Sequence, residues 1–192
     1  VKFGVANAIL AGDALQTLAF EWLAACKAPP PYEPNRLVLE LARAAGSEGV
    51  IGGQVEDIEA EGREPSAEQV DYIHAHKTGA LLEVSVTAGA ILAGAKEEDV
   101  TRLGKYAQLI GLAFQVVDDI LDCTQTSEQL GKTAGKDEAV GKATYPSLVG
   151  LEESRKIADK LISDAKDLLK DYDQEKAAPL IGLADYIKNR QN

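Results

Sequence analysis

The sequence predicts an all-α protein built as one domain, and three observations support this prediction. Apolar residues make up 45% of the 192 residues, enough to fill one hydrophobic core. Alanine and leucine, which favour helices, occur throughout the chain. Strict alternation of apolar and polar residues, the pattern of a half-buried strand, is rare. Because no internal repeat or low-complexity linker interrupts residues 1–192, we expect a single domain over the whole chain.

Proline, glycine and capping residues set the expected helix boundaries. The first helix should stop at Pro29–Pro31, because proline cannot continue a helix and disfavours a helical residue before it. Ser66 followed by Gln69 has the form of a capping box and should open a long helix. The acidic residues up to Asp99 suit the start of the next helix, because negative charge is favoured at a helix N-terminus. Helices are thus expected at about residues 5–26, 35–45, 47–61, 66–94, 96–123, 145–172 and 177–189.

Charge and cysteine content narrow the function classes. The formal net charge of −11 disfavours nucleic acids and anionic membrane surfaces, because like charges repel. The two cysteines, Cys26 and Cys123, lack metal-binding spacing and are too few for a disulfide framework. No targeting peptide and no membrane span are visible. We therefore expect a soluble protein of a reducing compartment, with no nucleic-acid partner and no stable membrane insertion.

The segment Phe114–Asp122 carries the strongest functional signal. On a helix, which advances about 100° per residue, Gln115, Asp118, Asp119 and Asp122 share an arc roughly 100° wide. Apolar residues surround them, so a merely solvated acidic face is not expected. Three carboxylates on one face repel each other unless a cation joins them. Magnesium, which prefers one or two carboxylates together with waters and phosphate oxygens, fits this need. Chance acids on an exposed helix are the alternative.

Basic residues that could hold phosphate lie in two places. Lys77 and Thr78 stand within an apolar helix segment, where an inward-facing lysine needs an anionic partner. A lysine that extends its ammonium to water is the alternative. A loop that contains glycines holds Lys132, Lys136 and Lys142, and glycine lets such a loop approach a ligand closely. A solvated surface loop is the alternative there. The loop departs from a nucleotide-binding P-loop, because aspartate follows its lysine where that motif requires serine or threonine.

Seven motifs spread along the chain carry a resemblance to a known family. They are Leu10–Leu15, Gly52–Ile58, His76–Leu82, Phe114–Asp122, Leu130–Asp137, Lys142–Pro146 and Leu183–Ile187. Together they resemble the trans-prenyl diphosphate synthases, and within these the geranylgeranyl diphosphate synthases of plastid and bacterial type. The resemblance implies an antiparallel helical bundle of the isoprenoid synthase type. It also implies a prenyltransferase that requires Mg²⁺ and joins isopentenyl diphosphate to an allylic diphosphate.

The resemblance further implies roles for individual residues. In such enzymes the allylic diphosphate ionises with magnesium on its diphosphate, and isopentenyl diphosphate attacks the carbocation. Lysines and metal placed where diphosphate charge develops serve this chemistry. Catalysis is implied for Lys77, Asp118 and Lys132. Metal binding is implied for Asp118, Asp119, Asp122 and Asp137, and substrate binding for Lys77, Thr78, Gln115, Lys132, Lys142, Gln54 and Asp57.

Part of the family pattern does not occur in these residues. The family's first aspartate-rich motif lies just ahead of the segment that matches Val1–Asp13, so that motif and the first helices of the fold are expected outside this sequence. A protein that lacks this motif altogether is the alternative. Two other functions stay open: a non-catalytic or regulatory subunit of a heteromeric synthase, and a terpene cyclase of related fold. The resemblance also implies a homodimer, or a heterodimer with a homologous subunit. It favours the plastid stroma, with the cytoplasm as the alternative.

Overall fold

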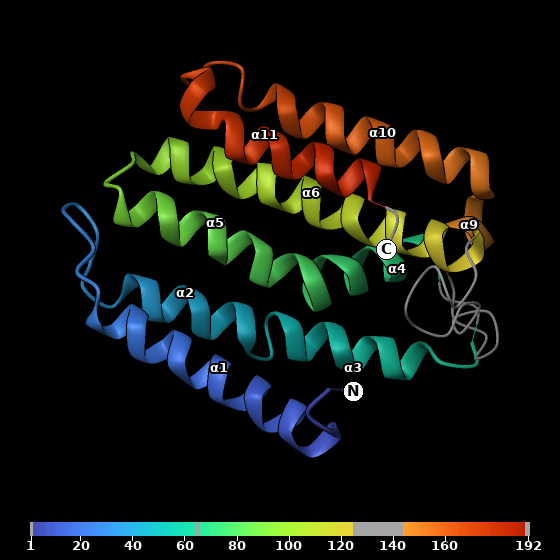
Figure 1. Cartoon of the computed structure of the whole chain (residues 1–192), viewed down its shortest axis with the longest axis horizontal. Coiled ribbons are helices and arrows are strands. Elements are labelled where there is room, and N and C mark those ends of the chain that lie inside the picture. Colours follow the sequence, from blue (N-terminus) through green and yellow to red (C-terminus); the bar gives the residue numbers. More distant parts are fainter. Residues whose placement is uncertain (1, 64–65, 125–143, 191–192) are drawn as a thin grey trace.

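The computed structural model describes residues 2–63, 66–124 and 144–190. Every regular element within these ranges is helical, which confirms the predicted all-α class. They are α1 (Val5–Ala25), α2 (Arg36–Ala45), α3 (Val50–Ala60), α4 (Ala67–His74), the π-helical turn η1 (Ala75–Gly79), α5 (Ala80–Leu92), α6 (Glu97–Thr124), α9 (Tyr145–Val149), α10 (Leu151–Asp167) and α11 (Gln174–Asn189). Figure 1 shows the helices side by side, with the long helix α6 between α5 and the pair α10 and α11. Among the described helices, none is both long and apolar enough to cross a membrane.

The prediction of one continuous helix over residues 145–172 is wrong, because the structure has two helices there. The helix breaks at Gly150, whose φ of 83° lies in the left-handed region that glycine adopts without steric strain. α9 therefore ends at Val149, and α10 begins at Leu151 in a new direction. The regular helix also ends at Asp167, five residues before the predicted end.

The helix predicted over residues 66–94 is present, with one irregularity. Its capping box is confirmed, because the Gln69 backbone N–H donates to Ser66 Oγ at 3.3 Å and the Ser66 N–H donates to the Gln69 side chain at 3.0 Å. Between α4 and α5 the chain widens into η1, which holds Lys77 and Thr78. A π-helical turn inserts one extra residue into a helix and often marks a functional site.

The largest core cluster forms around the middle of α6. Tyr106, Ile110 and Ala113 have no exposed surface. They pack with Ile162 of α10 and Ala184 of α11. Burying one large apolar side chain stabilises a fold by about 1.5–3 kcal/mol, so this cluster holds α6 firmly against α10 and α11.

Two smaller clusters lie toward the ends of α6. Near its start, Val100 packs in one cluster with Leu37 of α2 and Ile91 of α5. Near its end, Val116 packs in another with Val70 of α4 and Tyr145 of α9. The second cluster is the one that fixes the aspartate-bearing end of α6.

The first helix, α1, lies at the edge of the structure and contacts α2. None of its side chains is fully buried, and Trp22 keeps 65% of its surface exposed. The predicted site residues that the structure describes lie on α3, η1 and α6. α4, the start of α9 and the end of α11 pack beside them.

Tyr106 links α6 to α11 and offers a test of the main core. Its hydroxyl donates to the Leu180 carbonyl oxygen at 2.6 Å. Tyr106→Phe should lower the free energy of unfolding by about 0.5–1.5 kcal/mol, because a part-buried hydrogen bond is lost. Urea unfolding at neutral pH measures the difference from the wild-type protein.

The same tyrosine should make stability fall at high pH. Burial raises the pKa of Tyr106 to about 12, whereas an unfolded tyrosine titrates near 10. Between these values the unfolded state binds fewer protons than the folded state, so the free energy of unfolding decreases as the pH rises. The decrease should be shallower in Tyr106→Phe. Equal slopes in urea titrations between about pH 9 and pH 12 would contradict this assignment.

Candidate functional site

The three aspartates near the end of α6 have different surroundings. Asp118 keeps 34% of its side-chain surface exposed. Asp119 and Asp122 are buried, with 4% and 6% of their surface exposed. Gln115, one turn earlier, is half-buried. Of the three carboxylates, Asp118 is thus the one most open to a ligand from solvent.

Asp119 joins α6 to the start of α9. Its Oδ2 accepts a hydrogen bond from the Tyr145 backbone N–H at 3.0 Å and lies 3.6 Å from His74 Nε2. The Tyr145 hydroxyl donates to Asp71 of α4, and its ring stacks on His74 with centroids 5.8 Å apart. Burial, with help from Asp71, raises the pKa of Tyr145. Asp119 therefore has a structural contact in addition to the metal-binding role predicted for it, which stays a prediction.

Arg190, which the sequence analysis did not single out, contacts Asp118 from the end of α11. Its guanidinium donates to Asp118 Oδ1 at 3.1 Å and to the Phe114 carbonyl oxygen at 2.9 Å. It also lies over the Phe114 ring, 3.8 Å from the ring centroid. No local pattern could have indicated this contact, because the two partners are 72 residues apart and meet only when α11 packs on α6.

Lys77 lies in η1 and forms an ion pair with α3. Its Nζ is 2.6 Å from Asp57 Oδ2, and the two side chains are 32% and 12% exposed. The two backbones approach closely at Gly53, where a Cβ atom would lie 2.3 Å from the Lys77 backbone nitrogen. Gln54 and Thr78 are half-buried beside this contact. An ammonium group has three donors, so Lys77 can serve a ligand while Asp57 orients it.

A second close contact places η1 beside α6. A Cβ atom on Gly111 would lie 3.2 Å from the Gly79 Cα. Gln115 and Asp118 follow Gly111 by about one and two turns of helix, at about 5.4 Å per turn. Lys77 precedes Gly79 by two residues on a helix that runs antiparallel to α6. The structure thus brings Lys77 to the part of α6 that carries the predicted polar face.

Magnesium fits these residues when phosphate oxygens complete its coordination. Within the described ranges, no group of three or more histidine, cysteine, aspartate or glutamate side chains is placed to hold a metal ion. Magnesium, however, needs only one or two protein carboxylates beside waters and phosphates, and Asp118 and Asp122 lie on successive turns of α6.

Three predicted residues, Lys132, Asp137 and Lys142, lie outside the described residues.

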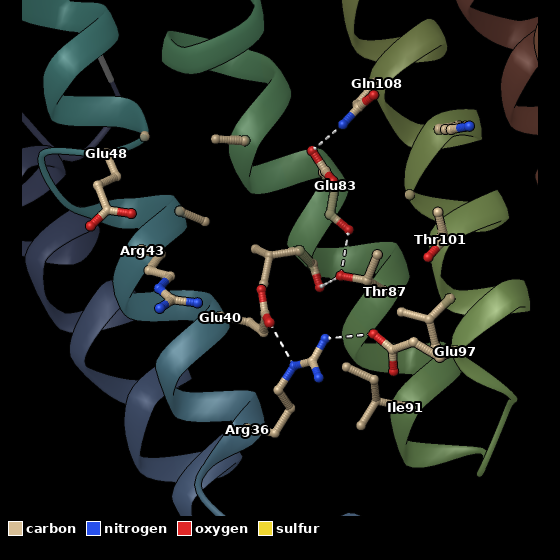
Figure 2. Close-up of a pocket in the computed structure, with 17 residues that line it drawn as sticks. Arg36, Glu40, Arg43, Glu48, Glu83, Thr87, Ile91, Glu97, Thr101 and Gln108 are labelled. Atoms are coloured by element: carbon tan, nitrogen blue, oxygen red, sulfur yellow. Dashed lines mark hydrogen bonds and ion pairs between the residues drawn. The ribbon is translucent and has the colours of Figure 1, made fainter. Parts of the chain in front are cut away.

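A separate cleft of about 410 Å³ lies between α2, α5 and the first half of α6 (Figure 2). Its lining includes none of the predicted site residues that the structure describes. Arg36 pairs with both Glu40 at 2.6 Å and Glu97 at 3.0 Å, and Gln108 donates to Glu83 at 2.9 Å. The three basic residues of the lining stand among four glutamates, so the cleft has no excess of positive charge for a diphosphate. The basic residues are Arg36, Arg43 and Lys105, and the glutamates are Glu40, Glu48, Glu83 and Glu97. The end of α6 with η1 is therefore the candidate site.

Comparison with known proteins decides the family. The sequence model described as polyprenyl synthetase matches residues 1–178. The chain belongs to the polyprenyl synthetase family. This confirms the resemblance that the seven motifs indicated.

Individual polyprenyl synthetases match over almost the whole chain. The chain is 50% identical over 196 residues to heterodimeric geranylgeranyl pyrophosphate synthase large subunit 1, chloroplastic, of Arabidopsis thaliana. This match covers 99% of the chain and 53% of that protein. The chain is 52% identical over 192 residues to the chloroplastic geranylgeranyl pyrophosphate synthase of Catharanthus roseus, with 99% and 54% covered. The solved geranyltransferase of Helicobacter pylori, complexed with magnesium and isoprenyl diphosphate, superposes with a TM-score of 0.74 at 33% identity, over 98% of this chain and 61% of that one. The chain thus spans about half the length of the curated relatives it matches.

Proposed function

We propose that the protein is a prenyltransferase that condenses isopentenyl diphosphate with an allylic diphosphate, with geranylgeranyl diphosphate as the product. The observation that carries the proposal is the position of Lys77, in η1, beside the aspartate-bearing end of α6. Recognition of a diphosphate requires a cationic donor and carboxylates that can share a metal ion with it. Membership of the polyprenyl synthetase family supports the substrate class. Several relatives at 49–52% identity are named geranylgeranyl pyrophosphate synthase, which favours this product, and one relative at 52% is named geranylfarnesyl diphosphate synthase, so the product assay must separate the two chain lengths.

The chemistry requires that negative charge on a departing diphosphate be neutralised. Magnesium would supply a Lewis acid for the phosphate oxygens while the allylic carbon–oxygen bond breaks. Asp118 and Asp122 would hold this ion, with Asp119 as a further ligand. Lys77 would donate to a phosphate oxygen, and Asp57 keeps its ammonium directed by the ion pair at 2.6 Å.

Side chains near the reacting carbons would shape the pocket rather than carry charge. We assign this role to Gln115, Thr78 and Gln54, which are half-buried on α6, η1 and α3. The isopentenyl double bond would attack the allylic carbocation and form the new carbon–carbon bond, which leaves a tertiary carbocation. This carbocation would lose a proton to the departed diphosphate and so form a new double bond. The remaining predicted residues, Lys132, Lys142 and Asp137, would add phosphate donors and support for the metal.

The names of the relatives suggest the setting in which the protein acts. One relative is named as the large subunit of a heterodimeric synthase, which favours a dimer with an identical or a homologous chain. Both quoted plant relatives are named chloroplastic, which favours the plastid over the cytoplasm. The net charge of −11 disfavours a nucleic-acid partner.

The complete protein, mixed with labelled isopentenyl diphosphate, geranyl or farnesyl diphosphate and Mg²⁺, should form a longer prenyl diphosphate. Chelation of the metal with EDTA should abolish the product, because the leaving diphosphate would lose its counter-charge. Chromatography of the dephosphorylated products measures chain length.

Two outcomes would replace this proposal with another function. A cyclic hydrocarbon formed from an allylic diphosphate alone would indicate a terpene cyclase. No product, together with co-purification of an active synthase that changes its product in the presence of this chain, would indicate a regulatory subunit.

A further inference from the structure

The end of α11 places a buried cation on the aspartate-rich helix. The Arg190 side chain is only 6% exposed, although arginine is normally a surface residue. Its guanidinium makes the contacts with Asp118, the Phe114 carbonyl oxygen and the Phe114 ring described above. Its Nε is buried and has no hydrogen-bond partner among the described residues. An unsatisfied buried donor is unfavourable, so these contacts must offset a substantial desolvation penalty.

The two members of this ion pair have unequal access to solvent. Asp118 is 34% exposed, so solutes can approach its carboxylate, whereas Arg190 reaches it from the packed side. The carboxylate oxygen that accepts the guanidinium bond belongs to the residue proposed to bind magnesium. A divalent ion at this carboxylate would stand within a few ångströms of a guanidinium in a partly buried site, where like charges repel strongly.

We propose that Arg190 is the resident counter-ion of Asp118 and that it competes with divalent metal for this carboxylate. Metal binding would then displace the guanidinium from Asp118 and loosen the end of α11. By thermodynamic linkage, the contact of Arg190 with Asp118 weakens metal binding by the same factor by which metal weakens the contact. This inference rests on the proposed function only in its assignment of Asp118 as a metal ligand, and it does not require turnover.

Metal binding by the complete protein tests the competition. Mn²⁺, a spectroscopic substitute for Mg²⁺, is titrated into the protein with inorganic pyrophosphate present to complete the coordination. The free ion is measured by electron paramagnetic resonance, and a titration of pyrophosphate without protein is subtracted. Arg190→Gln should bind Mn²⁺ more tightly than the wild-type protein by about 5- to 150-fold, the usual range of coupling between sites. Arg190→Lys, which keeps the positive charge, should stay close to the wild type.

Lys188→Gln is the matched control. It removes one positive charge from the same end of α11, but Lys188 pairs with Asp159 of α10 at 2.8 Å on the surface. Its Mn²⁺ affinity should remain within about twofold of the wild type, because exposed charges are screened. Equal or weaker binding in Arg190→Gln than in Lys188→Gln would overturn the proposal. Absence of Mn²⁺ binding in every variant would overturn it too, by removing the metal assignment, whereas failure of condensation alone would leave it intact.

A double-mutant cycle tests the same competition through the free energy of unfolding, without measuring a metal binding constant. Arg190→Gln, Asp118→Asn and the double variant are unfolded by urea with inorganic pyrophosphate present throughout, once with EDTA and once with saturating Mg²⁺. The two positions should be coupled in EDTA, because each single change removes the ion pair between Arg190 and Asp118, and the coupling should vanish in Mg²⁺. Coupling of the same size under both conditions would overturn the competition and would indicate a purely structural ion pair.

Discussion

Replacing Gly53 by alanine is expected to lower the free energy of unfolding by about 2–3 kcal/mol. The new Cβ atom would lie 2.3 Å from the Lys77 backbone nitrogen and 2.8 Å from His76 Cβ. Overpacking of this kind costs about 1–3 kcal/mol, and backbone atoms have less freedom to yield than the end of a flexible side chain. The helices α3 and η1 must therefore separate, which also weakens the ion pair between Lys77 and Asp57. Guanidinium chloride unfolding measures the loss of stability.

Gly89→Ala is the matched control for this change. Gly89 lies within α5, and a Cβ atom there would meet no described atom within 4 Å. Alanine favours a helix over glycine by about 0.5–1 kcal/mol, so this variant should be more stable than the wild type. If Gly53→Ala were as stable as Gly89→Ala, the close contact of α3 with η1 would be wrong.

The helix boundaries that depend on nearby residues could be predicted from the sequence, and the irregularities at glycines could not. Prolines and the capping box at Ser66 act within a few residues, and the helices they bound appear as expected. The break at Gly150 was missed because a single glycine inside a helical pattern is often tolerated. The π-helical turn was missed because it accompanies close packing of η1 against both Gly53 and Gly111, which no local pattern contains.

For the candidate site too, the features set by nearby residues could be predicted, and the contacts between distant residues could not. Helical periodicity placed the aspartates on one side of α6, and the apolar surroundings of Lys77 indicated an anionic partner. The partners themselves lie far along the chain: Lys77 meets Asp57 across 20 residues, and Asp119 meets the Tyr145 backbone across 26. Such pairs depend on how helices dock, so single-sequence reasoning could not tell that Asp118 is the more exposed carboxylate and Asp119 the anchored one.

Replacing Lys77 by glutamine is expected to reduce kcat/KM for the allylic diphosphate by about 10²–10³-fold, the usual loss when one preorganised charge partner of a transition state is removed. Glutamine keeps a hydrogen-bond donor on a side chain that is one atom shorter, so the loss reports mainly the missing positive charge. Steady-state kinetics of the complete protein measure it. Lys105→Gln, an equal change of charge at an exposed position of α6 outside the proposed site, should leave kcat/KM unchanged.

Loss of activity through misfolding can be separated from loss of charge at the site. In Lys77→Gln the Asp57 carboxylate, 12% exposed, keeps its charge without the lysine, so this variant should also be less stable. Adding Asp57→Asn removes the negative charge that faced the lysine and should recover part of the stability. Activity should stay low in the double variant, because the phosphate donor is still absent. Recovery of activity together with stability would show that Lys77 acts only through its ion pair with α3, and its role in diphosphate binding would have to be withdrawn.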